Sequence, residues 1–300
     1  MTELSRGAAP LPQRRPPASE QDASLSLPRR TAGPRRAGRH RSLHRLSVAS
    51  DAPTLVLAVP GSAADDRVEL AEQIAESAAY SCPGVDIRFG YLRGGHESLD
   101  EILASGSQHN VGPAPQAVVV PLLAGPHPAV DAEISTAVSR AAAPVMLAAR
   151  LGPHPLLAGA LHDRLSEVGL ARASRARGIN IAAGGIGVLV VADRGPEAMN
   201  DAGVAAVLLA ARLAIPTAPA SLGDRASIQA ALERLLEAGA SRPAIAPYVI
   251  GPESDPGEFG QLSAALSAPC AAPLGAHQAV AQLVAVRYGE ALARISITSH

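Results

Sequence analysis

Residues 144–161 read PVMLAARLGPHPLLAGAL, and residues 269–284 read PCAAPLGAHQAVAQLV. Aligning the two stretches places three residues of the first, Leu151, Gly152 and His154, opposite Leu274, Gly275 and His277 of the second. Their offset exceeds a hundred residues, which is far longer than the period of solenoid repeats. The similarity therefore predicts duplication of a whole folding unit and not a stacked array.

Two earlier pairs of segments recur in the same order. Residues 117–125 (AVVVPLLAG) match residues 244–251 (AIAPYVIG), and residues 54–61 (TLVLAVPG) match residues 188–195 (VLVVADRG). We therefore expect two homologous half-domains, at 53–168 and 186–293.

Short apolar runs alternate along the chain with segments of helical spacing. The apolar runs predict strands at 54–59, 85–91, 117–123, 145–149, 186–192, 215–220, 243–250 and 269–273. The segments of helical spacing predict helices at 65–80, 98–105, 130–142, 155–168, 200–213, 225–238, 257–266 and 277–293. This alternation indicates an α/β fold in which each half-domain is a parallel sheet flanked by helices.

The first fifty residues differ in composition from the rest. They carry ten arginines against three acidic residues, a net charge of +7, so that the remainder carries −8 to give the total of −1. A segment rich in Pro, Ser and Arg cannot bury enough apolar surface to offset chain entropy, so residues 1–50 are expected to be disordered. They are either an electrostatic arm for nucleic acid or anionic surfaces, or a solvated tail. Residues 169–185, rich in Ala, Arg and Gly, are expected to link the two halves.

Composition also narrows the functional class. Aromatic residues make up only 2% of the chain, which argues against a base-stacking nucleic-acid surface. No apolar run reaches membrane-spanning length. Cys82 and Cys270 lack metal-type spacing and are read as free thiols of a reducing, cytoplasmic compartment. No Walker loop occurs and no Gly-x-Gly-x-x-Gly follows a strand, so we expect no organic cofactor.

In open parallel sheets, ligands bind at the carboxyl ends of the strands. The loops at 60–64, 92–97, 124–130, 193–197, 221–225 and 251–257 are where functional residues are expected.

The motifs in these loops resemble the class II sirohydrochlorin chelatases, in their long, duplicated form. The matching segments, in chain order, are Pro60-Gly61-Ser62, Phe89-Gly90-Tyr91-Leu92, Glu97-Ser98-Leu99, Val120 to His127, Leu151 to Leu156, Pro273 to His277 and Arg287-Tyr288. The resemblance covers about residues 53–293. It implies ATP-independent insertion of Co²⁺ or Fe²⁺ into sirohydrochlorin, a lyase activity in cobalamin or sirohaem synthesis. It also implies two half-domains that face each other across a cleft, in a chain that is monomeric through its duplication.

Imidazoles suit this chemistry, because a neutral histidine binds a divalent metal and also accepts protons near neutral pH. By the resemblance, His127 is the retained family histidine, whereas the position of the other is Pro60, which has neither a lone pair nor a proton to exchange. His96, in the adjoining loop, either compensates for this loss, so that His127 and His96 are the catalytic and metal-binding pair, or is a solvated loop residue.

Further candidates follow from the repeat alignment. Glu253 occupies the position of His127 and is a third candidate metal ligand. Arg194 and Arg225 are candidates for binding the substrate carboxylates, or are solvated strand-end residues. Gly61 and Ser62 are expected to contact the substrate in the first turn. His154 and His277, at helix starts, are read as capping residues.

Three functions remain open at this point. The first is a working chelatase that acts on a sirohydrochlorin-like tetrapyrrole. The second is a non-catalytic protein that holds a metal or a tetrapyrrole. The third is a degenerate homologue kept as an interaction partner, with its basic tail docking elsewhere.

Overall fold

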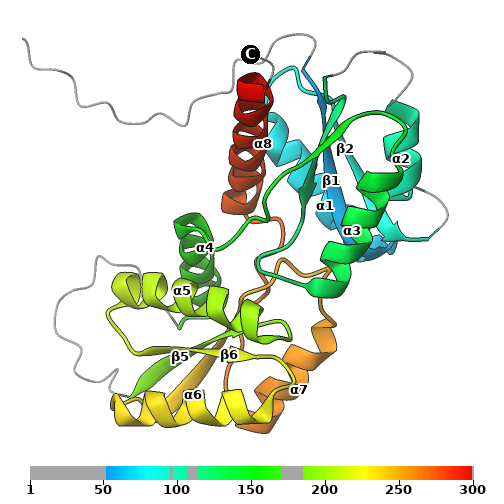
Figure 1. The fold of residues 1–300 in the computed structure, drawn as a ribbon. Helices are drawn as coiled ribbons and strands as arrows, with labels where there is room; N and C mark the ends of the chain where they lie inside the picture. Colours follow the sequence, from blue (N-terminus) through cyan, green and yellow to red (C-terminus); the bar gives the residue numbers. More distant parts are fainter. Residues whose placement is uncertain (1–51, 95–96, 107–113, 171–184, 299–300) are drawn as a thin grey trace, which may run out of the picture. The chain divides into compact units, whose positions relative to one another are not determined.

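The structure, a computed structural model, describes residues 52–94, 97–106, 114–170 and 185–298, all within the compact unit Leu43–His300 (Figure 1). Within these residues, the chain forms two separate parallel sheets with helices between successive strands. The predicted α/β class, with parallel sheets flanked by helices, is confirmed.

The first sheet has the order β2-β1-β3-β4. Its strands are β1 (Thr54–Ser62), β2 (Ile87–Arg93), β3 (Ala117–Pro121) and β4 (Val145–Leu147). All three pairings are parallel, with Leu55 opposite Ile87 on one side and Val118 on the other. Because both faces of this sheet are covered, β1 and β3 are continuous apolar runs and do not alternate with polar residues.

The second sheet has the order β6-β5-β7, again parallel. Its strands are β5 (Ile186–Ala192), β6 (Thr217–Ser221) and β7 (Arg242–Pro247). In each sheet the first strand in the sequence is an interior strand, paired on both sides.

Eight helices accompany the strands in the described residues. They are α1 (Asp65–Ala79), α2 (Leu99–Gly106), α3 (Pro128–Arg140), α4 (Pro155–Glu167), α5 (Pro196–Leu213), α6 (Arg225–Glu237), α7 (Pro256–Leu266) and α8 (Gln278–Thr298). Four of them begin with proline. The fixed φ of proline suits the first helical position, where no N–H is needed.

The buried side chains form three clusters. Alternate residues of β1 and β5, such as Leu55 and Val190, share the largest cluster, to which α1, α4, α5 and α8 contribute. The opposite face of the first sheet packs under α2 and α3. The opposite face of the second sheet packs under α6 and α7. The two sheets therefore share one continuous core and each has an outer core of its own.

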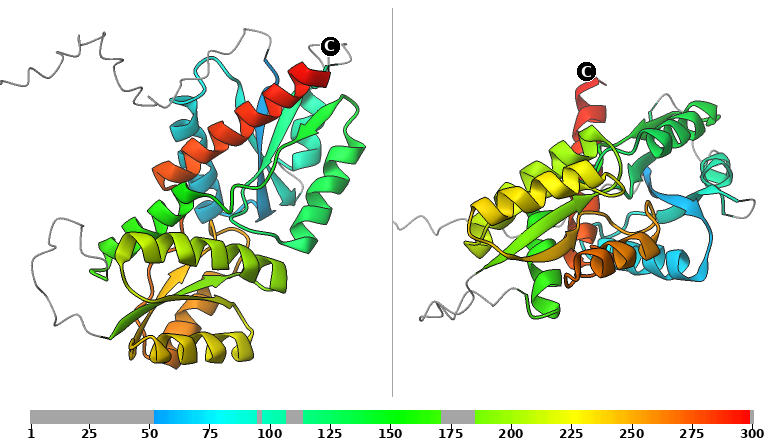
Figure 2. Two further views of the ribbon diagram at one scale, coloured as in Figure 1. Left: turned by 60° about the vertical axis from the view of Figure 1, so that its left-hand side comes forward. Right: turned by 90° about the horizontal axis from the view of Figure 1, so that it is seen from below.

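The helix that ends each half packs across the shared core. Helix α4 lies against α5, and α8 lies against α1 and α4 (Figures 1 and 2). The hydroxyl of Tyr288, on α8, donates a hydrogen bond to the carbonyl of Pro53, immediately before β1, at 2.6 Å. The last helix of the chain is consequently part of the packing around its first strand.

The two repeated turns are held by reciprocal arginine contacts. Arg287 on α8 donates to the carbonyl oxygens of Arg150 at 2.7 Å and Leu151 at 2.9 Å. Arg164 on α4 donates to the carbonyl of Leu274 at 2.8 Å. Arg164 follows His154 by ten residues, and Arg287 follows His277 by ten. Each arginine thus contacts the repeated turn of the other half.

One predicted strand is wrong. Residues 269–273 form only an isolated bridge, Ile245 with Cys270, beside β7. The amide of Ala271 donates to Ile245 at 2.9 Å, but the next residue of the same alternation is Pro273, which has no N–H to continue the ladder.

The homology and limits of the half-domains stay predictions. Most of the predicted linker, residues 171–184, and the whole tail, 1–50, lie outside the described residues. No helix within the described part is long and apolar enough to cross a bilayer.

Candidate functional site

His127 lies just beyond the carboxyl end of β3, where the strand-end rule places a ligand site. It is the N-cap of α3, and its Nδ1 accepts a hydrogen bond from the amide of Val130 at 3.3 Å. Its own amide donates to the carboxylate of Asp131 at 3.1 Å. The backbone at both ends of this turn is thus satisfied locally, which fixes the direction of the imidazole.

The other ring nitrogen meets a carboxylate from the second sheet. His127 Nε2 lies 3.1 Å from Oδ2 of Asp193, the residue that follows β5. The side chain of Asp193 is only 10% exposed and that of His127 is 25% exposed. The hydrogen bond to Asp193 raises the pKa of His127 above its ordinary value, against the opposing effect of burial.

These contacts define the proton arrangement of the ring. A nitrogen that accepts a hydrogen bond carries no proton, so the neutral imidazole holds its proton on Nε2 and donates it to Asp193. Both nitrogens of His127 are therefore engaged within the protein. A metal ion must displace one of these two partners to reach a lone pair.

Glu253 lies close to this pair but its carboxylate serves the local backbone. Its oxygens accept hydrogen bonds from the amides of Ile250 at 2.6 Å and Gly251 at 2.8 Å. Burial raises its pKa, while these hydrogen bonds act in the opposite direction. Its predicted role as a metal ligand stays a prediction.

A small cavity adjoins His127 and is lined from both halves, by Gly125, Pro126, His127, Ala192, Asp193, Ala198, Tyr248, Val249 and Glu253. The hydroxyl of Tyr248 is buried with no hydrogen-bond partner among the described residues, and burial raises its pKa. The cavity volume is about 10 Å³, which corresponds to the space for one water molecule. It cannot hold a tetrapyrrole, so any such substrate must bind outside it.

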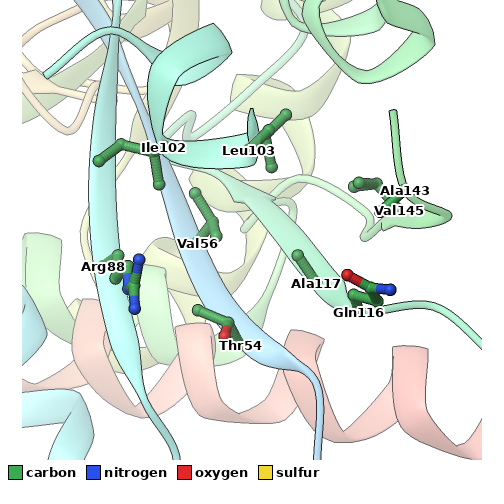
Figure 3. Close-up of a pocket in the computed structure, with 9 residues that line it drawn as sticks. All are labelled: Thr54, Val56, Arg88, Ile102, Leu103, Gln116, Ala117, Ala143 and Val145. Carbon is green, nitrogen blue, oxygen red and sulfur yellow. The ribbon is translucent and has the colours of Figure 1, made fainter. Parts of the chain in front are cut away.

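A second cavity of similar size lies at the opposite edge of the first sheet (Figure 3). Thr54, Gln116 and Val145 line it at the amino ends of β1, β3 and β4. None of the predicted site residues lines this cavity, and its position is opposite to the strand ends where ligands collect. We assign it no role in binding.

The carboxyl end of β1 contains the predicted substrate contacts, Gly61 and Ser62. Gly61 has φ +84°, a left-handed conformation that favours glycine. The guanidinium of Arg67 packs over it, and Arg67 donates to the carbonyl of Ser62 at 3.4 Å. Ser62 itself is exposed. The substrate-binding roles of Gly61 and Ser62 stay predictions.

The predicted arginines differ in their surroundings. Arg194, 59% exposed, forms an ion pair with Glu258 across the strand ends of the second sheet, with Nη1 3.1 Å from Oε2. A substrate carboxylate would compete with Glu258 for this guanidinium. Arg225 is the exposed first residue of α6. His96 lies outside the described residues.

The capping interpretation of the two repeated histidines agrees with their contacts. His154 Nδ1 accepts from the amide of Leu156, and His277 Nδ1 accepts from the amide of Ala279, both at 3.1 Å. His277 Nε2 lies 3.4 Å from Oδ2 of Asp163. Among the histidines that the structure describes, His127 is thus one of three that cap helices through Nδ1, and its buried carboxylate partner sets it apart.

Asp193 is the residue that the sequence analysis missed. In the repeat, Arg194 is opposite Pro60 and Asp193 is opposite the apolar Val59, so the alignment itself does not select Asp193. A signal was present, because Asp193 directly follows the apolar run 186–192. A carboxylate at a strand end is a candidate by the same rule that selected His127.

The fold and this strand-end pair define an α/β protein with two parallel sheets and a histidine–carboxylate pair shared between their strand ends. We compared the chain with family models, with curated proteins and with solved structures. Residues 54–168 match the family model described as CbiX. No curated protein matches the chain.

Two solved structures share the fold. SirB from Bacillus subtilis with Fe³⁺ is 17% identical, with a TM-score of 0.58 over 81% of this chain and 97% of the SirB chain. The sirohydrochlorin chelatase SirB from Bacillus subtilis subspecies spizizenii in complex with cobalt is 16% identical, with a TM-score of 0.57 over 80% and 95%. The similarity is thus one of sequence to the CbiX model over residues 54–168, and one of fold to the two SirB structures over most of the chain.

Proposed function

We propose that this protein is a sirohydrochlorin chelatase-like protein that inserts a divalent metal, Co²⁺ or Fe²⁺, into a tetrapyrrole without ATP. The observation that carries the proposal is His127, an imidazole at the carboxyl edge of the first sheet, within the segment that matches the CbiX family. Cobalamin or sirohaem synthesis is the expected context, and the metal and the tetrapyrrole are the expected small-molecule partners.

The insertion reaction has two chemical requirements that residues of the protein must meet. Two pyrrole protons must leave the macrocycle, and a metal must be delivered to its centre. The pair of His127 and Asp193 suits proton acceptance, because a carboxylate hydrogen-bonded to an imidazole stabilises the protonated ring. The direction of the His127 pKa, raised by Asp193, is consistent with this role.

A second candidate function is supported by a specific observation. Both nitrogens of His127 are engaged, and Pro60 supplies no donor in the neighbouring turn. A protein that binds the metal or the tetrapyrrole without turnover needs no second imidazole. This non-catalytic binding protein is therefore the alternative to the chelatase.

The two functions are separated by following tetrapyrrole absorbance. The full chain is mixed with sirohydrochlorin and Co²⁺, and then with Fe²⁺ under anaerobic conditions, beside a control without protein. A chelatase accelerates the change to the metallated spectrum with multiple turnovers. Saturable binding of sirohydrochlorin with the spontaneous rate supports the binding protein instead. If the protein neither binds sirohydrochlorin nor accelerates metal insertion, both proposed functions are overturned.

A further inference from the structure

The pairing of His127 with Asp193 joins residues from the strand ends of different sheets. His127 follows β3 of the first sheet, and Asp193 follows β5 of the second. Asp193 is 7% exposed overall, so its carboxylate is almost wholly removed from water. A buried carboxylate costs free energy unless it is paired, and here its contact in the cavity is the ring of His127.

The separation of the two donor atoms has a chemical meaning. Imidazole nitrogen and carboxylate oxygen bind zinc, and by extension neighbouring divalent metals, at about 2.0–2.2 Å. Two such donors at right angles around one ion lie about 3.0 Å apart. Nε2 of His127 and Oδ2 of Asp193 are 3.1 Å apart, so one cation can contact both atoms once the imidazole turns away from its hydrogen bond to Asp193.

We propose that His127 Nε2 and the Asp193 carboxylate together form a two-donor entry site for the divalent metal, built from both halves of the chain. The proposal rests on the metal-insertion function above and deepens it by naming the second protein donor. Asp193 is the donor that sequence alignment does not suggest, and Pro60 leaves the adjacent turn without one.

The exchange of proton for metal is balanced within the ring. When the cation takes the Nε2 lone pair, the imidazole remains neutral by carrying its proton on Nδ1. The amide of Val130 then loses its acceptor at the start of α3, a hydrogen bond of 3.3 Å. Loss of one capping hydrogen bond is a small cost beside the free energy of metal binding.

Two protein donors also fit a site that must release its metal. Among the described residues, no group of three or more His, Cys, Asp or Glu side chains is placed to hold an ion. A cation on His127 and Asp193 therefore keeps most of its coordination positions for water and for the incoming pyrrole nitrogens. A closed four-ligand site would retain the metal.

The test is a Co²⁺ titration of the full chain by calorimetry and by the cobalt absorption bands, without tetrapyrrole. Asp193→Asn keeps a side-chain oxygen that can accept from Nε2–H but removes the charge of a metal ligand. We expect Asp193→Asn, which loses a charged ligand, to weaken Co²⁺ binding by more than the roughly 10–100-fold that loss of an outer-shell partner causes, and Asp193→His, which supplies another donor, to retain it. If Asp193 only positions His127, the loss in Asp193→Asn will be no more than about 10–100-fold, and the proposal is overturned.

The chain offers a matched control. His277 caps α8 through Nδ1 and faces Asp163 through Nε2, but Asp163 is 56% exposed. Asp163→Asn should leave Co²⁺ affinity unchanged, and an equal loss in both variants would show a general charge effect and overturn the proposal. Absence of Co²⁺ binding in the parent would overturn it as well.

A measurement on the unsubstituted protein guards against a variant that fails to fold. Paramagnetic Co²⁺ should broaden the amide signals of His127 and Asp193 before those of His277 and Asp163, and the reverse order contradicts the site. The insertion rate is recorded separately. If Co²⁺ binding depends on Asp193 but no metal is inserted, the metal site is supported and the chelatase function is rejected. If metal is inserted but Co²⁺ binding does not depend on Asp193, the chelatase function is supported and this site is rejected.

Discussion

At the scale of single residues, His154 combines a helix cap with a titratable ring. Its Nδ1 accepts from the amide of Leu156 at the start of α4. Burial, reinforced by the charge of Arg287, lowers its pKa below 6.5. As pH falls, the His154 ring is therefore protonated in the unfolded chain before it is protonated in the folded protein. The contribution of neutral His154 to the free energy of unfolding is complete above pH 6.5 and decreases below it.

His154→Asn isolates that effect, because asparagine also caps helices but does not titrate. We expect the parent to lose stability relative to His154→Asn between pH 7.5 and pH 5, as measured by urea unfolding at both values. Other titratable groups are common to the two proteins and cancel in the difference. A stability difference that does not change with pH would contradict the assigned pKa direction.

One residue of the candidate site could be predicted from the sequence, and its partner could not. His127 was predictable, because a histidine directly after an apolar run marks the end of a parallel strand. Asp193 carries the same signal, but it lies 66 residues after His127, and their contact depends on how the two sheets meet. No local pattern contains that information.

At the scale of elements, the reciprocal arginines hold each repeated turn to the helix of the other half. Arg287, whose side chain is 14% exposed, contacts two backbone carbonyls of the first turn. We expect Arg287→Ala to reduce the free energy of unfolding by about 2–3 kcal/mol, because hydrogen bonds from a charged donor are lost and buried acceptors are left unpaired. Arg164→Ala should act similarly at the second turn.

Chemical denaturation of the two variants beside Arg234→Ala checks this prediction. Arg234 is exposed on α6 and donates to Ala230 of its own helix. Its replacement should change stability by no more than about 0.5 kcal/mol. If all three variants lower the free energy of unfolding equally, the arginine contacts to the two turns contribute no more than an exposed arginine does.

Most elements could be predicted from periodicity, and their ends were less accurate. Helix α5 begins at Pro196 and not at residue 200, although proline at a first helical position was a readable signal. The strand β2 begins at Ile87, two residues later than predicted. The failure at 269–273 has a physical cause in Pro273, which sequence alone also shows.

At the scale of the whole molecule, α8 completes the packing of the first sheet. Its side chains Val280, Leu283, Val284 and Tyr288 are fully buried in the shared core. Deletion of residues 278–298 should therefore expose the face of the first sheet that α1 and α8 cover. The chain's last helix stabilises its first strands, which no analysis of sequence periodicity can predict.

Hydrogen exchange of the shortened chain measures this effect. We expect the amides of β1 and β3 to lose protection by a larger factor than those of β5 and β6. The cost is of order several kcal/mol, since four large side chains lose their buried surface. Uniform protection across both sheets would show that α8 is not part of the first sheet's core.

The insertion rate of Co²⁺ into sirohydrochlorin by His127→Ala, compared with the parent, tests the central claim most directly. His277→Ala is the matched control, since it removes a second capping histidine that faces a more exposed carboxylate. The account predicts that His127→Ala falls to the rate without protein while His277→Ala retains the parent rate. If His127→Ala inserts cobalt as fast as the parent, the strand-end imidazole is not the group that carries the reaction, and the proposed site is wrong.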